Sequence, residues 1–351
     1  MAQGIGSKLA IAFTKETTYG TKVAPAAGGY NRAKRCTVKN RAVQTSGNRN
    51  LGIPWASCVR VHSKKASGEV AFDMSYQGHE RYLVDLMGSG SDGYTLGAGA
   101  DALSATHLLS PKIAQTVGST LENHADLLKM EYPGQKISSL RFNFRKNDPL
   151  EAIATIVGLP HTLPDPPGAA AVSPAFLEEA VTAGVNPIPC INPVETTGGF
   201  VFSVGTAGGT GYTAVGIIEG DLTIDKPYDE DRGDIGSSVI AEPIVNGEPV
   251  MTFTGNIRKA FLDNSFILPF LQGIQKAFKF TYTSPVIIDI GGTVVYTFEI
   301  EAKYVRWLEA PPEVAGSGPI EDSIPFICES PDGTTAPLTI KLINGLIGAV
   351  T

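Results

Sequence analysis

Strict alternation of apolar and polar residues recurs in several stretches of the chain and predicts a protein built mainly of β-strands. Between Glu69 and Tyr76 every second residue is large and apolar, which places one face of a strand against a core. A turn signal at residues 147–149 separates another strand from its return over residues 150–157. The alternating positions are Val70, Phe72, Met74 and Tyr76; Leu140, Phe142 and Phe144; Phe278, Phe280 and Tyr282; and Phe298, Ile300, Ala302 and Tyr304. Val305 and Trp307 then change the phase of the last strand, which predicts a β-bulge.

Helical periodicity is confined to short stretches. Two stretches carry the same apolar stripe, with spacing i, i+1, i+4 and i+5, and each is followed by a glycine that can end a helix. We therefore expect one short helix at each place and a third over residues 174–183. The two stripes are Tyr82, Leu83, Leu86 and Met87 before Gly88, and Phe266, Ile267, Phe270 and Leu271 before Gly273.

The same order of elements occurs twice along the chain. A strand is followed by a long polar stretch, a second strand, a short helix and further strands, first within residues 36–158 and again from residue 222. This order predicts an internal duplication, and the alternative is one larger β domain with coincidental alternation. The fold class that we expect is mainly β with minor helix: two tandem β-sandwich or half-barrel units, each flanked by a short helix.

The composition of the chain shifts between the two units, where proline and glycine become frequent. We expect a connector or insertion there that holds at most a short helix and a hairpin. The predicted domains are an N-terminal arm (1–35), a first unit (36–158), the connector (159–214) and a second unit with a C-terminal strand (215–351).

Composition and charge narrow the class of protein. The chain has 351 residues, of which 42% are hydrophobic and 18% are charged, so it can bury a sizeable core. Its net charge of -7 disfavours binding to duplex DNA through a basic face. Cys36, Cys58, Cys190 and Cys328 lack the spacing of a zinc site, and we expect free thiols in a reducing compartment. We expect no export signal and no membrane partner, because no apolar stretch approaches the roughly 18–20 residues that span a bilayer.

No catalytic, cofactor-binding or metal-binding residues are expected. His79 and Glu80 begin like a zinc-protease helix, but Leu83 stands where the second histidine is needed. The acidic loop 229–234 lacks the ligand pattern of a calcium loop, and the glycine-rich stretch 205–211 lacks the Lys-Ser or Lys-Thr of a phosphate-binding loop. An enzyme such as a carbohydrate-active β-protein would need a carboxylate pair that the sequence does not identify. Surface or loop positions are expected for the five histidines, His62, His79, His107, His124 and His161.

Several strings in combination resemble the major tail tube proteins of bacteriophages with long, non-contractile tails (siphovirus type). Residues 13–21, FTKETTYGT, resemble the opening segment of that family, with its Glu-x-Thr-Tyr-Gly-Thr string. Residues 132–140, YPGQKISSL, resemble its Tyr-Pro-Gly-Cys-Lys-hydrophobic-x-Ser-Leu strand, and residues 68–88 resemble its strand and helix. The resemblance covers most of residues 8–160 and, more loosely, 220–330. The long connector departs from the family pattern.

This resemblance implies a structural protein of the virion tail, assembled in the host cytoplasm. Copies are expected to join their sheets into rings that stack into a hollow tube, through which DNA passes without specific binding. Tape measure, tail terminator and tail-tip proteins are the implied partners. Because rings in this family have sixfold or pseudo-sixfold symmetry, two units per chain predict a trimer, with a hexamer as the alternative. The alternative function is another β-rich virion component: a tail terminator, a tail-tip or baseplate hub protein, or a capsid decoration protein.

Three segments are expected to make contacts between rings: residues 1–35, 40–67 and 226–246. The last two are too long for hairpin loops, which usually have about 2–5 residues, and in the family such a loop reaches the adjacent ring. The connector is expected on the outside of the ring, where its backbone can stay hydrated. A basic run is expected either to be solvated or to contact an acidic surface of a neighbouring subunit; it consists of Arg32, Lys34, Arg35, Lys39 and Arg41.

Overall fold

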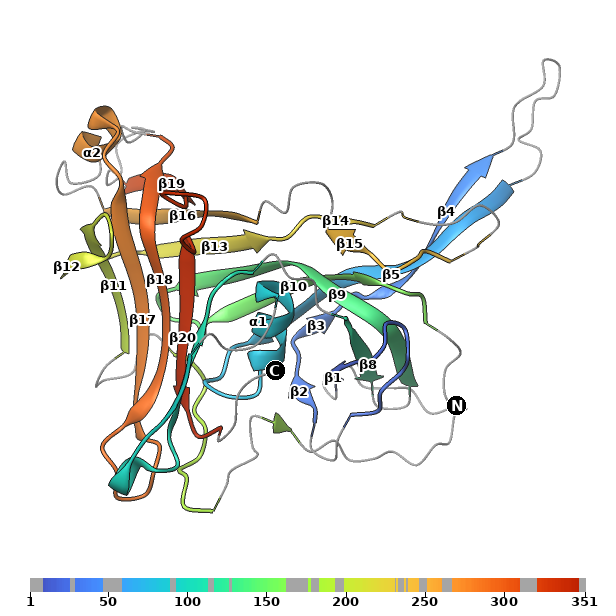
Figure 1. The fold of residues 1–351 in the computed structure, drawn as a ribbon, viewed down its shortest axis with the longest axis horizontal. Coiled ribbons are helices and arrows are strands. Elements are labelled where there is room, and N and C mark those ends of the chain that lie inside the picture. The colour runs from blue at the N-terminus through green and yellow to red at the C-terminus, as the bar shows by residue number, and fades with distance from the viewer. Residues whose placement is uncertain are drawn as a thin grey trace.

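Hydrogen-bonded β-strands form one continuous network that bends into three sheets, so the protein is mainly β as predicted (Figure 1). All ladders between named strands of the described residues are antiparallel. The computed structural model describes residues 9–25, 29–46, 59–88, 93–112, 117–125, 128–161, 176–177, 183–192, 199–230, 232, 237, 239–245, 251–260, 267–309 and 321–346.

Sheet I contains strands from both halves of the chain. Its pairing order is β3 and β4, then β5, β10, β9, β13, β16 and β19. The bounds are β3 (Arg35–Cys36), β4 (Lys39–Ser46), β5 (Val59–Asp73), β10 (Glu151–Gly158), β9 (Leu128–Arg145), β13 (Glu219–Asp225), β16 (Thr252–Ala260) and β19 (Glu321–Cys328).

Sheet II crosses one end of sheet I, and Figure 1 shows its long strands standing almost perpendicular to those of sheet I. Its order is β12 (Thr210–Ala214), β11 (Gly199–Thr206), β17 (Lys276–Ile287), β18 (Val295–Trp307), β20 (Leu338–Asn344), β7 (Ala105–Leu109) and β6 (Gly93–Leu96). The last residues of β18 pair with β19 and thereby connect the two sheets.

Sheet III is small and belongs to the N-terminal half. It contains β2 (Asn31–Arg32), β1 (Leu9–Lys15), β8 (Ser119–Ala125) and the first half of β9. The remaining elements are the pair β14 (Tyr228–Asp229) and β15 (Ile244–Val245), the helices α1 (Glu80–Met87) and α2 (Ile267–Gln272), and the 3-10 turn η2 (Gly99–Asp101).

Two sets of six strands follow the same pairing order. The first set pairs in the order β1, β8, β9, β10, β5, β4, and the second in the order β11, β17, β18, β19, β16, β13. The order along the chain is also the same, with α1 after β5 and α2 after β16. In each set one strand, β9 or β18, passes from a ladder with the preceding strand to a ladder with the following one.

Two ranges expected to lie outside the units contain strands of these sets. Residues 1–35 include β1, in which Ala10, Ile11 and Ala12 are fully buried and which pairs along its whole length with β8. The hairpin expected within residues 159–214 is β11–β12, but β11 pairs along β17 as part of sheet II. Both strands occupy the same position in their sets, beside the strand that follows the helix.

The polar stretch 40–67 is a hairpin rather than a loop within the described residues. Strand β4 pairs with the first half of β5, and Figure 1 shows this hairpin projecting away from the body of the molecule. The second polar stretch lies along it: the Ile240 N–H donates to the Lys64 carbonyl at 3.3 Å. The Lys65 Nζ also lies 3.1 Å from a carboxylate oxygen of Glu230. The two polar stretches therefore contact and stabilise each other.

The apolar faces of sheets I and II pack against each other to form the core. The Phe144 ring stacks on Phe280 with centroids 4.4 Å apart, and the Phe142 ring lies 5.9 Å from that of Phe298. The alternating residues predicted to face a core are buried, except that Tyr304 is half-buried. The predicted bulge in β18 is confirmed, because Ala302 and Val305 lie opposite Phe278 and Lys276, which leaves one extra residue on β18.

Both predicted helices form, but they differ in burial. Helix α1 packs its apolar residues against β9, β1 and β7, and it ends at Gly88, whose φ of 107° suits a residue without a Cβ. In α2 the stripe is not buried as expected: Phe270 is half-buried, and the exposed fraction of Leu271 is 70%. The reason is that no counterpart of β6–β7 follows α2, since β17 begins only four residues after Gln272. The third expected helix falls mostly outside the described residues; Phe176 forms a β-bridge with Tyr30.

Replacing Phe142→Ala should lower the free energy of unfolding by about 3–5 kcal/mol, because the ring is fully buried between sheets I and II. Urea unfolding of the monomeric subunit, followed by tryptophan fluorescence, measures this loss. Val201→Ala, at a side chain that is 40% exposed, is the control and should change it by less than about 1 kcal/mol. A loss below about 1 kcal/mol for Phe142→Ala would show that the two sheets do not depend on this contact.

Candidate functional site

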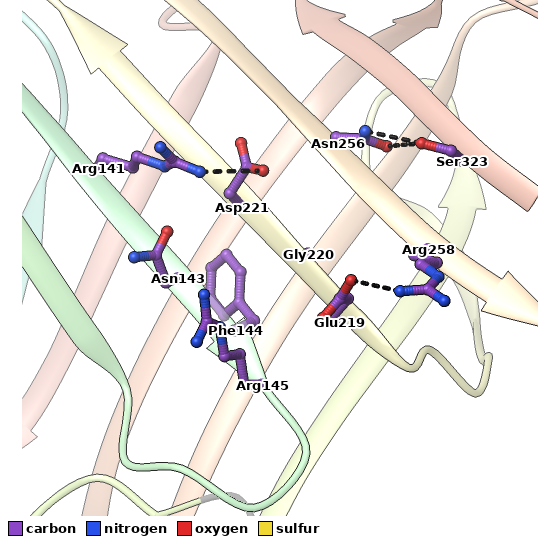
Figure 2. Close-up of a pocket in the computed structure, with 10 residues that line it drawn as sticks. All are labelled: Arg141, Asn143, Phe144, Arg145, Glu219, Gly220, Asp221, Asn256, Arg258 and Ser323. Atoms are coloured by element: carbon purple, nitrogen blue, oxygen red, sulfur yellow. Dashed lines mark hydrogen bonds and ion pairs between the residues drawn. The ribbon is translucent and has the colours of Figure 1, made fainter.

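The face of sheet I opposite the core carries polar side chains from strands that are far apart in the chain (Figure 2). In β9, alternation directs Leu140 and Phe142 into the core and Arg141 and Arg145 outward. Strands β13, β16 and β19 continue the same face, which we call the polar face. Figure 2 shows the shallow hollow on it, lined by Arg141, Asn143, Phe144, Arg145, Glu219, Gly220, Asp221, Asn256, Arg258 and Ser323.

Opposite charges lie side by side across the strands of the polar face. The Arg258 Nη1 donates to the Glu219 Oε1 at 2.8 Å, and the Arg141 Nη2 lies 3.6 Å from the Asp221 Oδ2. Arg145 is directly opposite Glu219 in the ladder of β9 with β13. Burial between the strands raises the pKa of the Asp221 carboxyl above its ordinary value, and the charge of Arg141 opposes that shift.

The basic run predicted from the sequence joins the same face at its other end. The Lys34 Nζ lies 2.6 Å from Asp73 and 3.7 Å from Glu151, and Arg35 lies 2.9 Å from Glu69. These ion pairs lie within the chain, and both side chains remain about half exposed, so a further contact with a neighbouring subunit stays a prediction.

The other members of the basic run differ among themselves. The Arg32 guanidinium lies over the Phe176 ring, 4.7 Å from its centroid. Lys39 and Arg41 are exposed, and a contact of these two with a neighbour stays a prediction.

The pairing of charges limits what the polar face can bind. A polyanion binds a protein through cations that neutralise its phosphates. Here a phosphate would have to compete with the carboxylates beside Arg141 and Arg258. The polar face is therefore hydrated and charged, but it offers polyanions only weak attraction.

The two sequence strings that carry the family resemblance touch each other in the structure. The buried carboxylate of Glu16, at the end of β1, accepts hydrogen bonds from the Gly20 and Gly134 N–H groups and from the Thr120 Oγ1, each at 2.7 Å. A Cβ on Gly134 would come within 2.8 Å of the Tyr19 ring. Glu16 and Gly134 thus fix the junction of β1 with β8 and β9.

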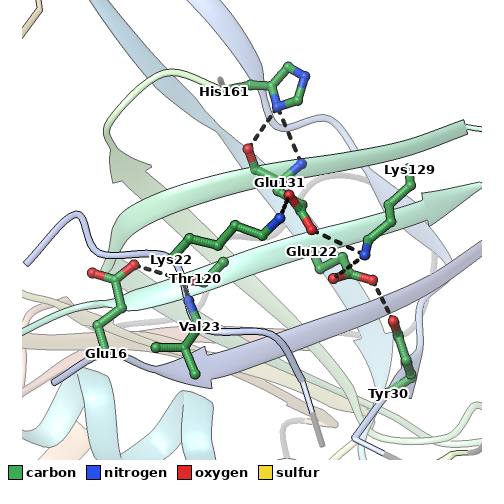
Figure 3. Close-up of polar contacts among 9 residues, drawn as sticks. All are labelled: Glu16, Lys22, Val23, Tyr30, Thr120, Glu122, Lys129, Glu131 and His161. Carbon is green, nitrogen blue, oxygen red and sulfur yellow. Dashed lines mark hydrogen bonds and ion pairs between the residues drawn. The ribbon is translucent and has the colours of Figure 1, made fainter. Parts of the chain in front are cut away.

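Beside this junction, acidic and basic side chains form a network on sheet III (Figure 3). Lys129 lies 3.1 Å from both Glu122 and Glu131, Lys22 pairs with Glu131, and the Tyr30 hydroxyl donates to Glu122. All these charges are partnered within the chain. The network holds the segment after β1 against β8 and β9, which is a structural role.

His79 and Glu80 are buried at the start of α1; His79 lies in the loop just before the helix, which the expectation allowed, but it is not at the surface. The His79 ring stacks on Phe72 with centroids 4.5 Å apart, and burial lowers its pKa to about 3. Burial raises the pKa of Glu80 to about 7, although its carboxylate accepts hydrogen bonds from Gly78 and from the Asn344 Nδ2. A core position among aromatic rings, rather than a ligand site, explains this His-Glu pair.

The remaining candidates have the following positions. His107 is also buried, contrary to expectation, beside the Tyr94 ring. Cys36, Cys190 and Cys328 are not joined in a disulfide among the described residues, whereas Cys58 and most of the acidic loop 229–234 lie outside them. In the described part of the chain, no three His, Cys, Asp or Glu side chains are grouped to hold a metal ion. Among the same residues, no helix has the length and apolarity to cross a membrane.

Sequence reasoning missed the acidic side of the polar face. Glu219 and Asp221 alternate with Gly220 and Leu222 over a stretch too short to stand out by itself. Their neighbours Arg141 and Arg258 come from other parts of the chain. The alternation of Glu219 and Asp221 was therefore visible in the sequence. The strand pairing that places them beside Arg141 and Arg258 was not.

Comparison with known proteins identifies a family. Residues 6–328 match the family model described as phage tail tube protein. The match includes both six-strand sets, from β1 to β19. No curated protein matches the chain.

Replacing Glu80→Gln should change how stability depends on pH. A carboxyl whose pKa is about 7 when folded stabilises the fold at acidic pH, and this contribution is lost as the pH rises toward and beyond 7. The variant lacks that loss, so its stability relative to the unmodified protein should rise by about 2 kcal/mol between pH 5 and pH 8. Urea unfolding at several pH values measures the difference.

Glu309→Gln, at an exposed residue just after β18, controls for the loss of one negative charge. His79 acts in the opposite direction, since its lowered pKa makes the fold lose stability as the pH falls below about 6.5. That effect is common to both proteins and cancels in the comparison. A difference that stays constant from pH 5 to pH 8 would show that Glu80 titrates normally.

Proposed function

Because the chain belongs to the phage tail tube protein family, we propose that its copies join edge to edge into rings that stack into the hollow tube of a phage tail. The family places the protein among the structural components of the virion tail. The observation that carries the proposal is the ladder between β9 and β13, in which Ser139–Arg145 pairs with Glu219–Asp225. It joins the two six-strand sets into one continuous sheet with one polar face.

We take the ladder between β9 and β13 within one chain as the model for the contact between two chains in the ring. Strand β4 holds the position in the first set that β13 holds in the second. Strand β13 is paired on both edges, whereas β4, within the described residues, pairs with β5 alone. The strand equivalent to β9 in the second set is β18, which Leu308 and Glu309 follow. In the ring, these residues of one copy approach the β4 edge of the next, which closes the open edges of the sheet.

We propose three chains per ring. The common pairing order of the two sets supports an internal duplication, so that each chain supplies two positions of a pseudo-sixfold ring. The two sets differ in sequence and in covering elements, and their contacts around the ring are not identical. A ring of six chains is the alternative, in which the second set decorates the outside.

The polar face of sheet I is the surface that we assign to the lumen. Its opposite face is covered by sheet II and α1, so only the polar face can line a channel when the sheet closes. Pairs such as Arg258 with Glu219 and Arg141 with Asp221 leave little attraction for phosphates. DNA can therefore pass without being held.

The tail type and the partners rest on the sequence resemblance. We propose a long, non-contractile tail, with a tape measure protein inside the tube and terminator and tip proteins at its ends. The chain acts as a structural subunit without an enzymatic step. The host cytoplasm is the proposed place of assembly.

Electron microscopy of the concentrated protein, with reconstruction free of imposed symmetry, should show hollow tubes with three chains in each ring. The reason is that two sets per chain fill six similar positions. Six chains per ring would contradict the trimer. Finite rings or monomers in place of tubes would favour another virion component, such as a terminator, over a tube subunit.

Deleting residues 45–54, which include the end of β4 and the residues that follow it in the sequence, should leave a folded subunit that does not elongate into tubes. The hairpin projects beyond the body, where a stacked ring would lie, and its base is braced by Glu230. Circular dichroism checks the fold, and light scattering follows elongation. Shortening the exposed turn 207–209 between β11 and β12 by one residue is the control and should permit elongation. Normal tubes from the deletion variant would show that the hairpin makes no contact between rings.

A further inference from the structure

The two helices differ in one respect: α1 is covered and α2 is not. Aligned on their apolar stripes, Val84 and Met87 of α1 correspond to Leu268 and Leu271 of α2. Val84 and Met87 are at most 1% exposed, whereas Leu268 and Leu271 are 53% and 70% exposed. Ile274, just after α2, is 48% exposed. We call the surface of Leu268, Leu271 and Ile274 the α2 face.

The cover of α1 lies at the junction between the two sets. The Glu80 carboxylate at its start accepts a hydrogen bond from Asn344 at the end of β20, at 2.8 Å. Strand β7, which packs on α1, is itself paired with β20. Asp85 in the middle of α1 interacts electrostatically with Lys226, which follows β13. Helix α1 is therefore enclosed where the first set meets the second.

Helix α2 occupies the same position in the second set, at the end of the chain's sheet where no further set follows. Phe270 packs on the core and α2 contacts β18, so the helix is attached to the body of the molecule. Leu308, 48% exposed, follows the end of β18 at this same end of the β17–β18 hairpin. An apolar surface that is fixed in place and lacks a cover is typical of a protein interface.

We propose that the α2 face docks on a second copy of this chain in the same ring, against the side of that copy which carries β4. This inference rests on the proposed ring. It also rests on the repeat of the two sets. Within one chain, the second set lies beside α1, and β13 is its strand that faces the first set. Strand β4 occupies the position of β13 in the first set, so the β4 side of the next copy is placed beside α2. The contact is head-to-tail, since the α2 face meets a different surface on its neighbour, and such contacts close into rings when the rotation permits.

The test compares two variants at side chains of equal exposure. Leu271→Glu places a charge in the α2 face. Ile290→Glu places the same charge in the β17–β18 turn, at the other end of β17, where Ile290 is also 70% exposed. Sedimentation velocity over a range of concentrations measures lateral association into rings, and circular dichroism confirms the fold. We expect Leu271→Glu to raise the lateral dissociation constant at least tenfold, because a carboxylate would be buried without a partner, and Ile290→Glu to form rings like the unmodified protein.

Hydrogen exchange of the unmodified chain gives a second measurement that needs no substitution. Amides of residues 267–274 should exchange more slowly in rings than in monomers, whereas those of residues 290–293 should not change. Normal rings from Leu271→Glu, rings that form but no longer stack, or unchanged exchange at 267–274 would each overturn the inference and leave the proposed function standing. An unmodified protein that forms neither rings nor tubes would instead refute the proposed function, and the inference with it.

Discussion

The hydrogen bonding of β9 is the constraint on which the rest of the structure depends. This strand of 18 residues pairs with β8 over its first half, with β10 over its second half, and with β13 along the opposite edge of that second half. Among the described strands, no other ladder joins the N-terminal and C-terminal sets within sheet I. Sheet III, the polar face and the junction that encloses α1 all take their positions from it.

The same pairing order in both sets makes their differences informative. In the first set, the β6–β7 insertion follows α1, covers it and joins sheet II. The second set has no such insertion, and Pro269 stands in α2 where α1 carries the buried Asp85. A chain with two unlike sets can cover one helix internally and leave the other for a partner. A ring built from single identical sets could not make that distinction.

In the polar face, alternation within each strand and pairing between strands have separate effects. Because each strand must bury every second residue, the intervening residues are forced together on the other side. Their charges are arranged across strands, so that Glu219 lies between Arg145 and Arg258 in adjacent strands. The result is a polar surface on which opposite charges lie side by side.

The sequence by itself determined the elements whose signal is local. Period-two alternation identified β9, β10, β17 and β18 and their buried faces, and the apolar stripe before Gly88 identified α1, because side-chain direction follows from backbone geometry alone. The same alternation also predicted correctly that the protein is mainly β. The strings around Glu16 and Gly134 were recognised separately, as signs of a family.

The tertiary structure determined the features that depend on contacts between residues far apart in the sequence. Alternation within a strand does not identify the strand that pairs with it. For this reason β1 was assigned to an arm and β11 to a connector, although both are strands of the sheets. His79 was expected at the surface or in a loop, and the burial of this loop residue depends on its contact with Phe72 and on its position at the start of α1. Equal stripes predicted equal burial for α1 and α2, but burial depends on what packs above a helix. Strand pairing and packing join residues that are distant in sequence, and only the folded chain specifies which ones meet.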